Sequence, residues 1–442
     1  MDAEKQTTRT LWIGLLSILA AYFLVGSLYA TLTPDWQVPD EPAHFNYIRQ
    51  LADGEGLPVL EPGDYDQAFL SRLTAEGFPP KLSVAALEYE DHQPPLYYLV
   101  AAPVYVATGG DLAAVRFVSL LFGSGVILFA GLAAWKLFPG NAPLAITVAG
   151  FVAFVPQHVA MLAGVNNDSL SELWIALGFW LMLIAAEWKH FFALGIVLGL
   201  ALLTKSLAYV LAPAAFVALL LQARRTGEDW RWFVRTSAWV FAPALLLGAI
   251  WWFRNIAVYG WPDLIGLQRH AAVVVGQPRT TEWIQEFGAG EVARRFAHTT
   301  FNSFWGQFGW MGVLMDARVY LLLRTLTIGL LVGLALAWRQ RPRLSAFQRD
   351  GMIVLAAAAA ITAMLYVGYN VDFVQHQGRY LFPALLPLAV GAAIGLWGWT
   401  ATLARRWPTR AGLWRWLPVS IVPALAALSL LALYRFIIPT LA

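Results

Sequence analysis

The sequence contains no cysteine, and this absence removes several kinds of chemistry from consideration. Disulfides, thiolate nucleophiles and Cys-ligated metal centres are excluded. The chain is also poor in charge, with 13% Asp, Glu, Lys and Arg, whereas a soluble domain carries about 25%. A net charge of +3 is too small to indicate binding to nucleic acid. The low charge instead favours a protein whose surface meets lipid.

Apolar residues make up 59% of the 442 positions, and 21 Trp and 15 Tyr accompany them. Apolar runs recur along the chain, and a run of about 20 residues crosses a bilayer core as a helix. Trp and Tyr suit the belts at the two membrane faces. We therefore expect one all-α polytopic domain, residues 1–442, with about eleven membrane helices. The expected spans are residues 11–32, 113–137, 141–163, 169–187, 190–205, 207–222, 236–253, 318–338, 351–369, 379–402 and 416–438.

Three clusters of arginine predict the orientation of these spans. With the spans placed as above, all three clusters face one side, and such loops favour the cytoplasm. The N-terminus is then cytoplasmic in a cell (inner or plasma) membrane, while the long segments 33–112 and 254–317 face outward. If the apolar run 94–108 crossed the membrane, every later arginine cluster would lie on the opposite side. We therefore expect this run to form a short helix in the outer interface. The clusters are Arg224, Arg225, Arg231 and Arg235; Arg339, Arg341, Arg343 and Arg349; and Arg405, Arg406, Arg410 and Arg415.

The first outer segment carries acids at the predicted start of a helix, Pro39-Asp40-Glu41-Pro42-Ala43-His44-Phe45. Asp40 fits an N-cap, with proline in the first turn and His44 one turn later on the same face. The positive end of a helix keeps such a carboxylate ionised and able to accept a proton. A plain cap explains Asp40 alone, but the adjacent Glu41 and His44 make a functional role equally reasonable.

Further polar residues lie on the outer side. Asp91, His92 and Gln93 precede a diproline that begins the expected interfacial helix. A solvated turn would explain the charges there but not the His-Gln pair. Asp168 fits the cap of a span, which is the more common use of such a residue. The topology nevertheless places Asp168 on the same face as Asp40.

Four cations also belong to the outer side: Arg116, Lys205, Arg254 and Arg379, the last beside His376 and Gln377. Snorkelling anchors are the default interpretation. Cations on this face oppose the positive-inside bias, however, so an anionic partner is a reasonable hypothesis, and phosphate suits Arg and Lys. Together the acids and cations indicate that a lipid phosphate is held while a carboxylate activates an incoming hydroxyl or amine. Attack at the anomeric carbon of the attached sugar would invert that carbon.

With these residues in view, the chain resembles the GT-C superfamily of polytopic glycosyltransferases, which use polyprenyl-phosphate sugars. Within it, the chain is similar to the protein O-mannosyltransferase-like and aminoarabinose-transferase-like bacterial families, and the resemblance covers most of the chain. It depends on the order of several short motifs. These are Asp40-Glu41, the run from His92 to Tyr98, Asn167-Asp168, Thr204-Lys205-Ser206, Trp252-Phe253-Arg254-Asn255, and the run from Gln377 to Pro383.

The resemblance implies roles for individual residues. Asp40 takes the part of catalytic base or metal ligand, with Glu41 beside it and Asp168 in support. Arg116, Lys205, Arg254 and Arg379 would bind the phosphate of the donor. His44, Asp91, His92, Gln93, His376 and Gln377 complete the expected substrate site. The partners would be a polyprenyl-phosphate-linked sugar, an acceptor that is a glycan, lipid or protein, and membrane lipid.

The second outer segment, 254–317, is expected to recognise the acceptor. Thr280-Thr281-Glu282 looks like a helix start, and apolar residues follow at mainly helical spacing. We expect an amphipathic juxtamembrane helix there. The aromatic residues and amides of 302–310 suit either a sugar or, more commonly, a membrane belt.

No cofactor is expected to be required. Asp40, Glu41, Asp91 and Asp168 offer hard oxygen ligands, so a divalent cation such as Mg²⁺ or Mn²⁺ is an alternative. We expect no tightly bound metal, because the donor carries a single phosphate.

Three other functions stay open at this point. A transporter or flippase of a lipid-linked substrate would place ionisable groups near the bilayer midplane, where the expected spans have few. A ligase or polymerase of surface glycans would share the substrate class. A non-catalytic scaffold would not need the acids and cations gathered on one face.

Overall fold

The computed structural model describes residues 2–340 and 343–442. Helices make up most of this part of the chain, which confirms the expected all-α class. Within it the only strands are β1 (Gln307–Phe308) and β2 (Val313–Leu314), an antiparallel pair with Gln307 opposite Leu314. Arg341, one member of the second arginine cluster, lies outside the described residues.

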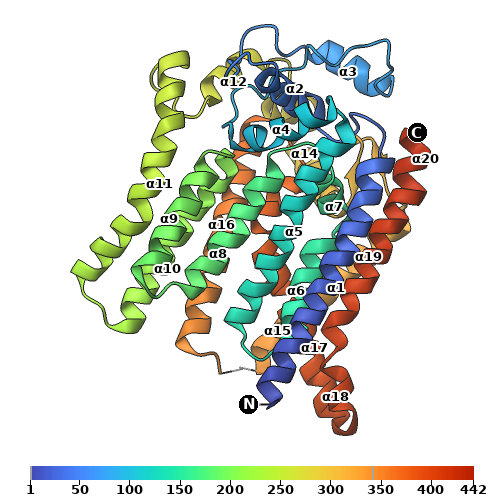
Figure 1. The fold of residues 1–442 in the computed structure, drawn as a ribbon. Coiled ribbons are helices and arrows are strands. Elements are labelled where there is room, and N and C mark those ends of the chain that lie inside the picture. Colours follow the sequence, from blue (N-terminus) through green and yellow to red (C-terminus); the bar gives the residue numbers. More distant parts are fainter. Residues whose placement is uncertain (1, 341–342) are drawn as a thin grey trace.

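Long helices stand side by side and form the body of the molecule (Figure 1). Eight helices are long and apolar enough to cross a membrane, or nine if one bent pair counts as a span, among the residues described. The chain is therefore a multi-pass membrane protein, and the expected number of eleven spans stays a prediction. The helices of the body are α1 (Asp2–Leu32), α5 (Leu112–Leu137), α8 (Asp168–Ile184), α9 (Trp188–Leu202), α10 (Leu211–Thr226), α11 (Trp230–Tyr259), α15 (Ala317–Gln340), α16 (Ala346–Asp372), α17 (Leu385–Arg406) and α19 (Ile421–Ala432).

Several expected spans are broken near one end of the bundle. The run 141–163 is two helices, α6 (Ala142–Phe154) and α7 (Pro156–Leu162), bent by 65°. Val155 between them is extended, as the residue before a proline prefers. The 3-10 helices η1 (Ser206–Val210) and η2 (Gly378–Ala384) likewise precede α10 and α17. These breaks place irregular backbone where the outer segments join the bundle.

Small residues allow some of the helices to approach closely. A Cβ atom added to Gly195 of α9 would lie 2.4 Å from the carbonyl oxygen of Val240 in α11. A Cβ atom on Gly333 of α15 would lie 2.0 Å from the carbonyl oxygen of Gly395 in α17. Glycine at such positions gives backbone-to-backbone packing, which holds membrane helices together where lipid removes the usual hydrophobic driving force.

The two long segments between helices gather at the upper end of the bundle in Figure 1. The first carries α2 (Glu41–Ala52), α3 (Gln67–Ala75) and α4 (Leu96–Thr108), and the second begins with α12 (Leu267–Val273). With 13 residues, α4 is about 20 Å long and too short to cross a bilayer core. It is the short helix expected from the run 94–108.

The juxtamembrane helix expected after Thr280 is two helices, α13 (Thr280–Phe287) and α14 (Ala289–Trp305). Gly288 separates them with a backbone φ of 81°, a conformation outside the helical region that glycine adopts without strain. The start of α13 is fixed to the end of α16, because the Thr280 hydroxyl donates to the carbonyl of Asn370 at 2.9 Å. Because Gly288 interrupts the helix, the expectation of one continuous juxtamembrane helix after Thr280 was wrong.

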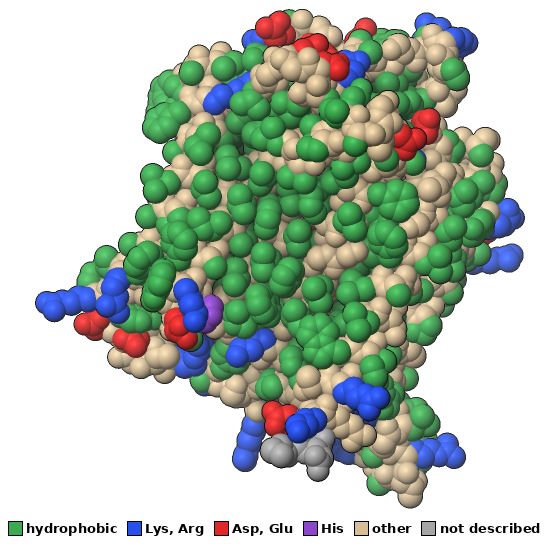
Figure 2. Space-filling model, viewed as in Figure 1, with side chains coloured by type: hydrophobic (Ala, Val, Ile, Leu, Met, Phe, Trp, Pro, Cys, Tyr) green, Lys and Arg blue, Asp and Glu red, His purple; other side chains and the backbone are tan. Residues whose placement is uncertain are grey.

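The chain ends with η3 (Pro408–Arg410), α18 (Ala411–Trp414), η4 (Leu417–Ser420), α19, a π-helical turn η5 (Leu433–Ile437) and α20 (Ile438–Leu441). The labelled N- and C-termini lie toward opposite ends of the bundle in Figure 1. Figure 2 shows a broad apolar area across the middle of one face, with most charged side chains above and below it. This distribution is what a bilayer around the helices requires.

Candidate active site

The first feature of the site is an ion pair between Asp40 and Arg379. Asp40 precedes α2, in the N-cap position, but its side chain makes no capping hydrogen bond and its φ is 67°. The expected capping role is therefore wrong. Asp40 Oδ2 lies 2.6 Å from Nη2 of Arg379, which belongs to η2. A non-glycine residue in the left-handed region costs free energy, and such residues concentrate at functional sites.

A tyrosine completes the surroundings of Asp40. The Tyr89 hydroxyl donates to Asp40 Oδ1 at 3.1 Å. Burial acts to raise the pKa of Asp40, but the charge and hydrogen bond of Arg379 outweigh it, so the pKa falls below its ordinary value. Asp40 is thus a carboxylate held by one cation and one hydroxyl.

A second ion pair joins Asp168 and Lys205. Asp168 is the first residue of α8 rather than its cap, and Lys205 lies in the break between α9 and η1. Lys205 Nζ lies 2.7 Å from Asp168 Oδ1 and donates to Asn167 Oδ1 at 2.9 Å. The acid expected to cap a span therefore pairs with a cation from the next break in the bundle.

His44 links the surroundings of the two pairs. Its Nδ1 lies 2.9 Å from the hydroxyl of Tyr98, and Asn167 Nδ2 donates to the same hydroxyl at 3.3 Å. Burial lowers the pKa of His44 to about 3, and Lys205, Asp40, Asp168 and Arg379 all act on it by charge. His44 is accordingly neutral at physiological pH, and the contacts through Tyr98 and Asn167 connect it to Lys205 of the second pair.

An apolar crevice of about 300 Å³ adjoins this site. It is bounded by Pro39, which precedes Asp40, by Met161 of α7, and by residues of η5 and α20. Arg379 Nη1 lies 3.9 Å from the sulfur of Met161. Arg379 Nε is buried without a hydrogen-bond partner among the described residues. The cation that holds Asp40 thus has an unused donor and lies beside an apolar space.

The sequence matches one family model, and the fold superposes on solved membrane proteins. Residues 91–252 match the family model of dolichyl-phosphate-mannose-protein mannosyltransferases. ArnT from Cupriavidus metallidurans superposes in its apo state with a TM-score of 0.56 at 16% identity, over 98% of this chain and 74% of ArnT. ArnT bound to undecaprenyl phosphate superposes with a TM-score of 0.51 at 15% identity, over 97% and 73% of the two chains. No curated protein sequence matches the chain.

The oligosaccharyltransferase of Archaeoglobus fulgidus, tethered to an acceptor peptide, superposes with a TM-score of 0.54 at 14% identity. The match covers 97% of this chain and 54% of that enzyme, so the chain spans about half the length of this relative. The chain has the GT-C fold. The family model and these solved relatives are glycosyltransferases, the class of enzyme expected from the sequence. The resemblance inferred from the ordered motifs is thereby confirmed.

Within this GT-C fold, Glu41 and Arg116 do not join the two ion pairs. Arg116 donates to Glu41 Oε1 at 2.8 Å and to Oε2 at 2.7 Å, and both side chains are buried. Its remaining donors go to the carbonyls of Ala30, Thr33 and Pro34. All five guanidinium donors are thus used inside the protein. The expected phosphate-binding role of Arg116 and catalytic role of Glu41 do not fit, and the pair instead fixes α2 against α5 and the end of α1.

Arg254 lies near the end of α11, where it donates to the carbonyl of Pro58 and to Asn255 Oδ1. Its guanidinium stacks 4.6 Å from the ring of Trp251 and 5.3 Å from that of Tyr259. These contacts tie the first outer segment to α11. Arg254 is therefore not in contact with Asp40 or Asp168.

His376 and Gln377 precede Arg379 but point elsewhere. The His376 ring packs edge-on against Trp283 of α13 and Phe296 of α14, and burial lowers its pKa. Gln377 Nε2 donates to Gln375 Oε1 at 2.8 Å. Neither side chain makes a recorded contact with Asp40, so their expected part in substrate binding stays a prediction.

The segment of Arg379 is fixed tightly to α14. The backbone N–H of Gly378 donates to Ser303 Oγ at 2.7 Å, and Ser303 Oγ lies 3.3 Å from the carbonyl of His376. A Cβ atom on Gly378 would lie 2.3 Å from the carbonyl oxygen of Thr300. Only glycine allows this approach, so η2 and α14 are in direct backbone contact beside the site.

The three residues before the diproline point in different directions. Gln93 Oε1 accepts from Asn167 Nδ2 at 3.3 Å and so reaches the second ion pair. His92 is buried, with Nδ1 3.2 Å from the carbonyl of Tyr89 and its ring 4.6 Å from that of His270. Asp91 accepts from Gln50 at 3.0 Å, away from Asp40. The expected substrate-binding cluster is thus divided, and Gln93 alone touches the site.

Sequence reasoning missed Tyr89, Asn167 and Glu90 as site residues. Burial, with the charge of Asp40, raises the pKa of Glu90 to about 8, and Lys205 and a hydrogen bond from Gln93 oppose the rise. Its Oε2 atom is buried without a partner. The acidic turn before the diproline was the available signal, but the residue of that turn that faces the ion pairs is set by backbone turns the sequence does not reveal.

The described residues include no group of three or more His, Asp and Glu side chains placed to hold a metal. Three of the acids named as alternative ligands are each paired with a cation: Asp40 with Arg379, Asp168 with Lys205, and Glu41 with Arg116. The A. fulgidus enzyme has also been solved in complex with Zn and sulfate. That property belongs to the relative, and the arrangement of carboxylates here supplies charge pairs.

Proposed function

We propose that this chain transfers a sugar from a polyprenyl-phosphate carrier to an acceptor on the outer side of the membrane. His44, one turn after Asp40, is linked to the pair of Asp168 and Lys205 through the Tyr98 hydroxyl and Asn167. This link between two ion pairs, Asp40 with Arg379 and Asp168 with Lys205, is the observation that carries the proposal. The four charged residues come from four breaks or helix starts along the chain. Two carboxylates and two cations in one partly closed site suit a reaction in which a phosphate leaves and a proton is removed.

Arg379 has two anionic partners in this proposal. Without donor it holds Asp40 at 2.6 Å. A donor phosphate competes for the guanidinium and draws it partly away from Asp40. Because Arg379 keeps the pKa of Asp40 low, this competition makes Asp40 a stronger base when donor is bound. Donor binding and activation of the acceptor are thereby coupled.

The proposed step is a single displacement. Asp40 takes the proton of an acceptor hydroxyl or amine while the acceptor atom forms a bond to the anomeric carbon. The bond from that carbon to the phosphate oxygen breaks, and its electron pair leaves with the polyprenyl phosphate. The phosphate gains one negative charge as it leaves, so Arg379 and Lys205 bind the transition state more strongly than the donor. The product has the inverted anomeric configuration.

The supporting residues follow from their contacts. Lys205 is positioned by Asp168 and Asn167, and Tyr89 keeps Asp40 oriented. The apolar crevice beside Pro39 and Met161 offers a place for the first isoprene units of the carrier. The helices α13 and α14 are assigned to the acceptor, and α14 contacts the segment of Arg379 through Ser303. The arginine clusters at the far end of the bundle favour an outer location for this site.

The test measures release of polyprenyl phosphate from a polyprenyl-phosphate sugar by the purified protein in lipid vesicles. Asp40→Asn keeps the size of the side chain but removes the base and its negative charge, so we expect a fall of about 10² or more in rate. Asp111→Asn is a matched control, because Asp111 is an exposed cap of α5 whose hydrogen bond Asn can keep.

Two results would contradict the proposal. Full activity of the Asp40→Asn variant would remove Asp40 from the mechanism. Movement of the intact lipid-linked sugar across the vesicle membrane without bond cleavage would indicate a transporter instead.

A further inference from the structure

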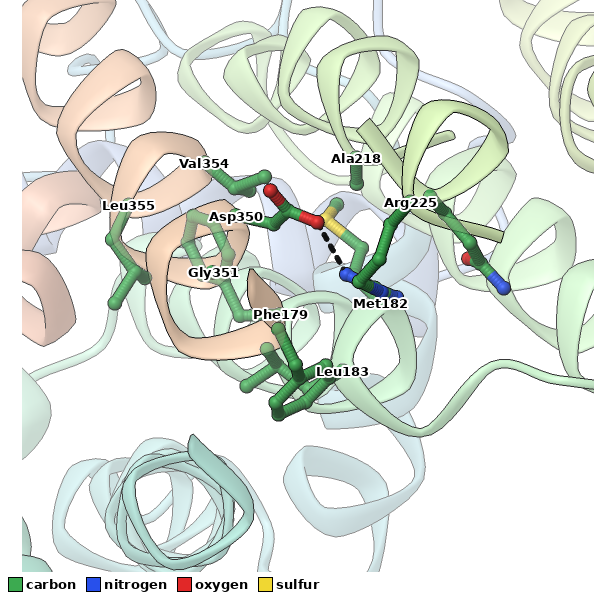
Figure 3. Close-up of a pocket in the computed structure, with 11 residues that line it drawn as sticks. Phe179, Met182, Leu183, Ala218, Arg225, Asp350, Gly351, Val354 and Leu355 are labelled. Atoms are coloured by element: carbon green, nitrogen blue, oxygen red, sulfur yellow. Dashed lines mark hydrogen bonds and ion pairs between the residues drawn. The ribbon is translucent and has the colours of Figure 1, made fainter. Parts of the chain in front are cut away.

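A second hollow lies between α8, α10 and α16, at the opposite end of the bundle from the ion pairs. It is a groove that is partly open to the surroundings of the bundle. Its lining is mainly apolar and includes Phe179, Met182 and Leu183 of α8 and Val354 and Leu355 of α16 (Figure 3).

The rim of the hollow is polar and charged. Arg225, at the end of α10, pairs with Asp350 of α16 at 2.5 Å, and Figure 3 shows the two side chains facing each other at the hollow. The Arg225 guanidinium also lies 5.2 Å from the centre of the Phe347 ring. Lys136 of α5 lies 6.0 Å from the centre of the same ring. Two cations thus approach one aromatic side chain at the mouth of the hollow.

Close packing brings α5 to this rim. A Cβ atom on Gly351 would lie 2.5 Å from Leu137 Cδ1 and 3.2 Å from Leu183 Cδ2. Gly351 therefore lets the ends of α5 and α8 approach α16. Lys136, the neighbour of Leu137, is placed beside the hollow as a result. The arrangement depends on a glycine that lines the hollow itself.

The charges at the rim do not balance. Asp350 neutralises one cation, and within the described part of the chain no carboxylate lies within 4.0 Å of Lys136. A net positive rim above an apolar hollow is complementary to a molecule with an anionic head and a hydrocarbon tail. In a membrane protein this chemistry is that of an anionic phospholipid.

We propose that the hollow binds an anionic phospholipid from the leaflet at this end of the bundle, with one acyl chain between α8 and α16. Its phosphate lies between Lys136 and Arg225, over the Phe347 ring. The site is separate from the proposed sugar donor, whose phosphate is assigned to Arg379 at the other end. The lipid contacts all three helices along the groove, and so stabilises their packing.

The experiment uses the full-length protein in vesicles of phosphatidylcholine that contain a trace of phosphatidylglycerol with a photoactivatable acyl chain. After irradiation, mass spectrometry identifies the labelled peptides. We expect label on residues 179–183 and 350–355, and several-fold less label there with a phosphatidylcholine probe of the same chain. Equal labelling by the two probes, or label spread evenly over the outer surface of the helices, would overturn the proposal.

Two variants separate the head and tail contacts. Lys136→Gln should reduce phosphatidylglycerol labelling to the level of the phosphatidylcholine probe, because it removes the unpaired cation. Ala218→Phe places a ring in the hollow and should reduce labelling by both probes. Lys189→Gln is the matched control, since Lys189 is an exposed cation at the same end that pairs with Glu187 at 2.9 Å. If Lys136→Gln labels like the wild type, the site is refuted even where Ala218→Phe fails to fold.

Discussion

Arg379 and Asp40 are 339 residues apart in the chain, yet their side chains are paired at 2.6 Å. The pair joins the start of the first outer segment to the start of a helix near the C-terminal end. Its consequence is chemical as well as structural, because the cation decides how basic the carboxylate is. Variants of this pair and of the residues around it test the relationship.

Replacement of Arg379 by Gln should shift the pH dependence of transfer. In the wild type the pKa of Asp40 lies below its ordinary value, because Arg379 outweighs the effect of burial. Without Arg379, its lowering effect on the pKa is lost while burial still raises it, so the pKa of Asp40 rises. The acidic limb of the rate profile, measured between about pH 4 and pH 8, should therefore move to higher pH. An unshifted limb together with a weaker donor affinity would limit Arg379 to phosphate binding.

Lys205→Met should weaken donor binding and leave Asp168 without its partner. We expect the dissociation constant for a polyprenyl-phosphate sugar to rise about tenfold or more, since each 1.4 kcal/mol lost is a factor of about ten. Lys81→Met is a suitable control, because Lys81 is an exposed cation in the first outer segment that pairs with Glu76. Binding measured by titration of the purified protein tests this; equal affinity in both variants would exclude Lys205 from the phosphate site.

Arg116→Met should affect folding rather than donor affinity. Removal of one partner from a buried ion pair costs about 3–5 kcal/mol, and Glu41 would be left buried and charged. Thermal unfolding followed by tryptophan fluorescence should show a lower midpoint. The double variant Glu41→Leu with Arg116→Met should recover part of the loss, because no charge is then buried. If Arg116→Met lowers donor affinity at unchanged stability, the structural role is incorrect.

Glu90→Gln should change the pH dependence of stability. In the folded protein the pKa of Glu90 is raised to about 8 from an ordinary value of 4.5. Between these values the folded state holds a proton that the unfolded state has released, so stability falls as pH rises and becomes level above about 8. The Glu90→Gln variant does not lose stability in this way, because Gln does not titrate. At pH 8 it should be more stable than the wild type by on the order of 1 kcal/mol or more. Melting temperatures of the two proteins at pH 5 and pH 8 give the comparison, and parallel curves would contradict it.

Chelation should leave transfer intact. The proposed clamp uses Arg379 and Lys205, and the described residues provide no cluster of three His, Asp and Glu side chains for a metal. Release of polyprenyl phosphate should therefore proceed in excess EDTA at the untreated rate. Loss of activity on chelation, with recovery on addition of Mg²⁺ or Mn²⁺, would restore the alternative of a divalent cation.

The sequence predicted the fold class well because lipid leaves few choices. Apolar runs near 20 residues identify membrane helices directly, and the expected run 113–137 differs by a single residue from α5 (Leu112–Leu137). Breaks were harder to foresee. Pro156 was visible in the sequence, yet the 65° bend after Phe154 depends on how α6 and α7 pack.

At the candidate site, the sequence drew attention to Asp40, Asp168, Lys205 and Arg379, but it did not show which acid pairs with which cation. Residue type and topology are enough to gather charges on one face. They do not reveal that Arg116 directs all five donors to Glu41 and three carbonyls. Nor do they show which of Glu90 and Asp91 faces Asp40, because adjacent residues in a turn point in different directions. Partner choice depends on distances set by the tertiary structure.

The contact of Gly378 with α14 has a mechanical consequence. With no side chain between them, the backbone of η2 and the backbone of α14 cannot slide independently, and Arg379 is the next residue along. A displacement of α14 is therefore expected to move the backbone beside Arg379 as well. Under the proposed function, an acceptor bound on α14 would thus be sensed by the arginine that is assigned to the donor phosphate.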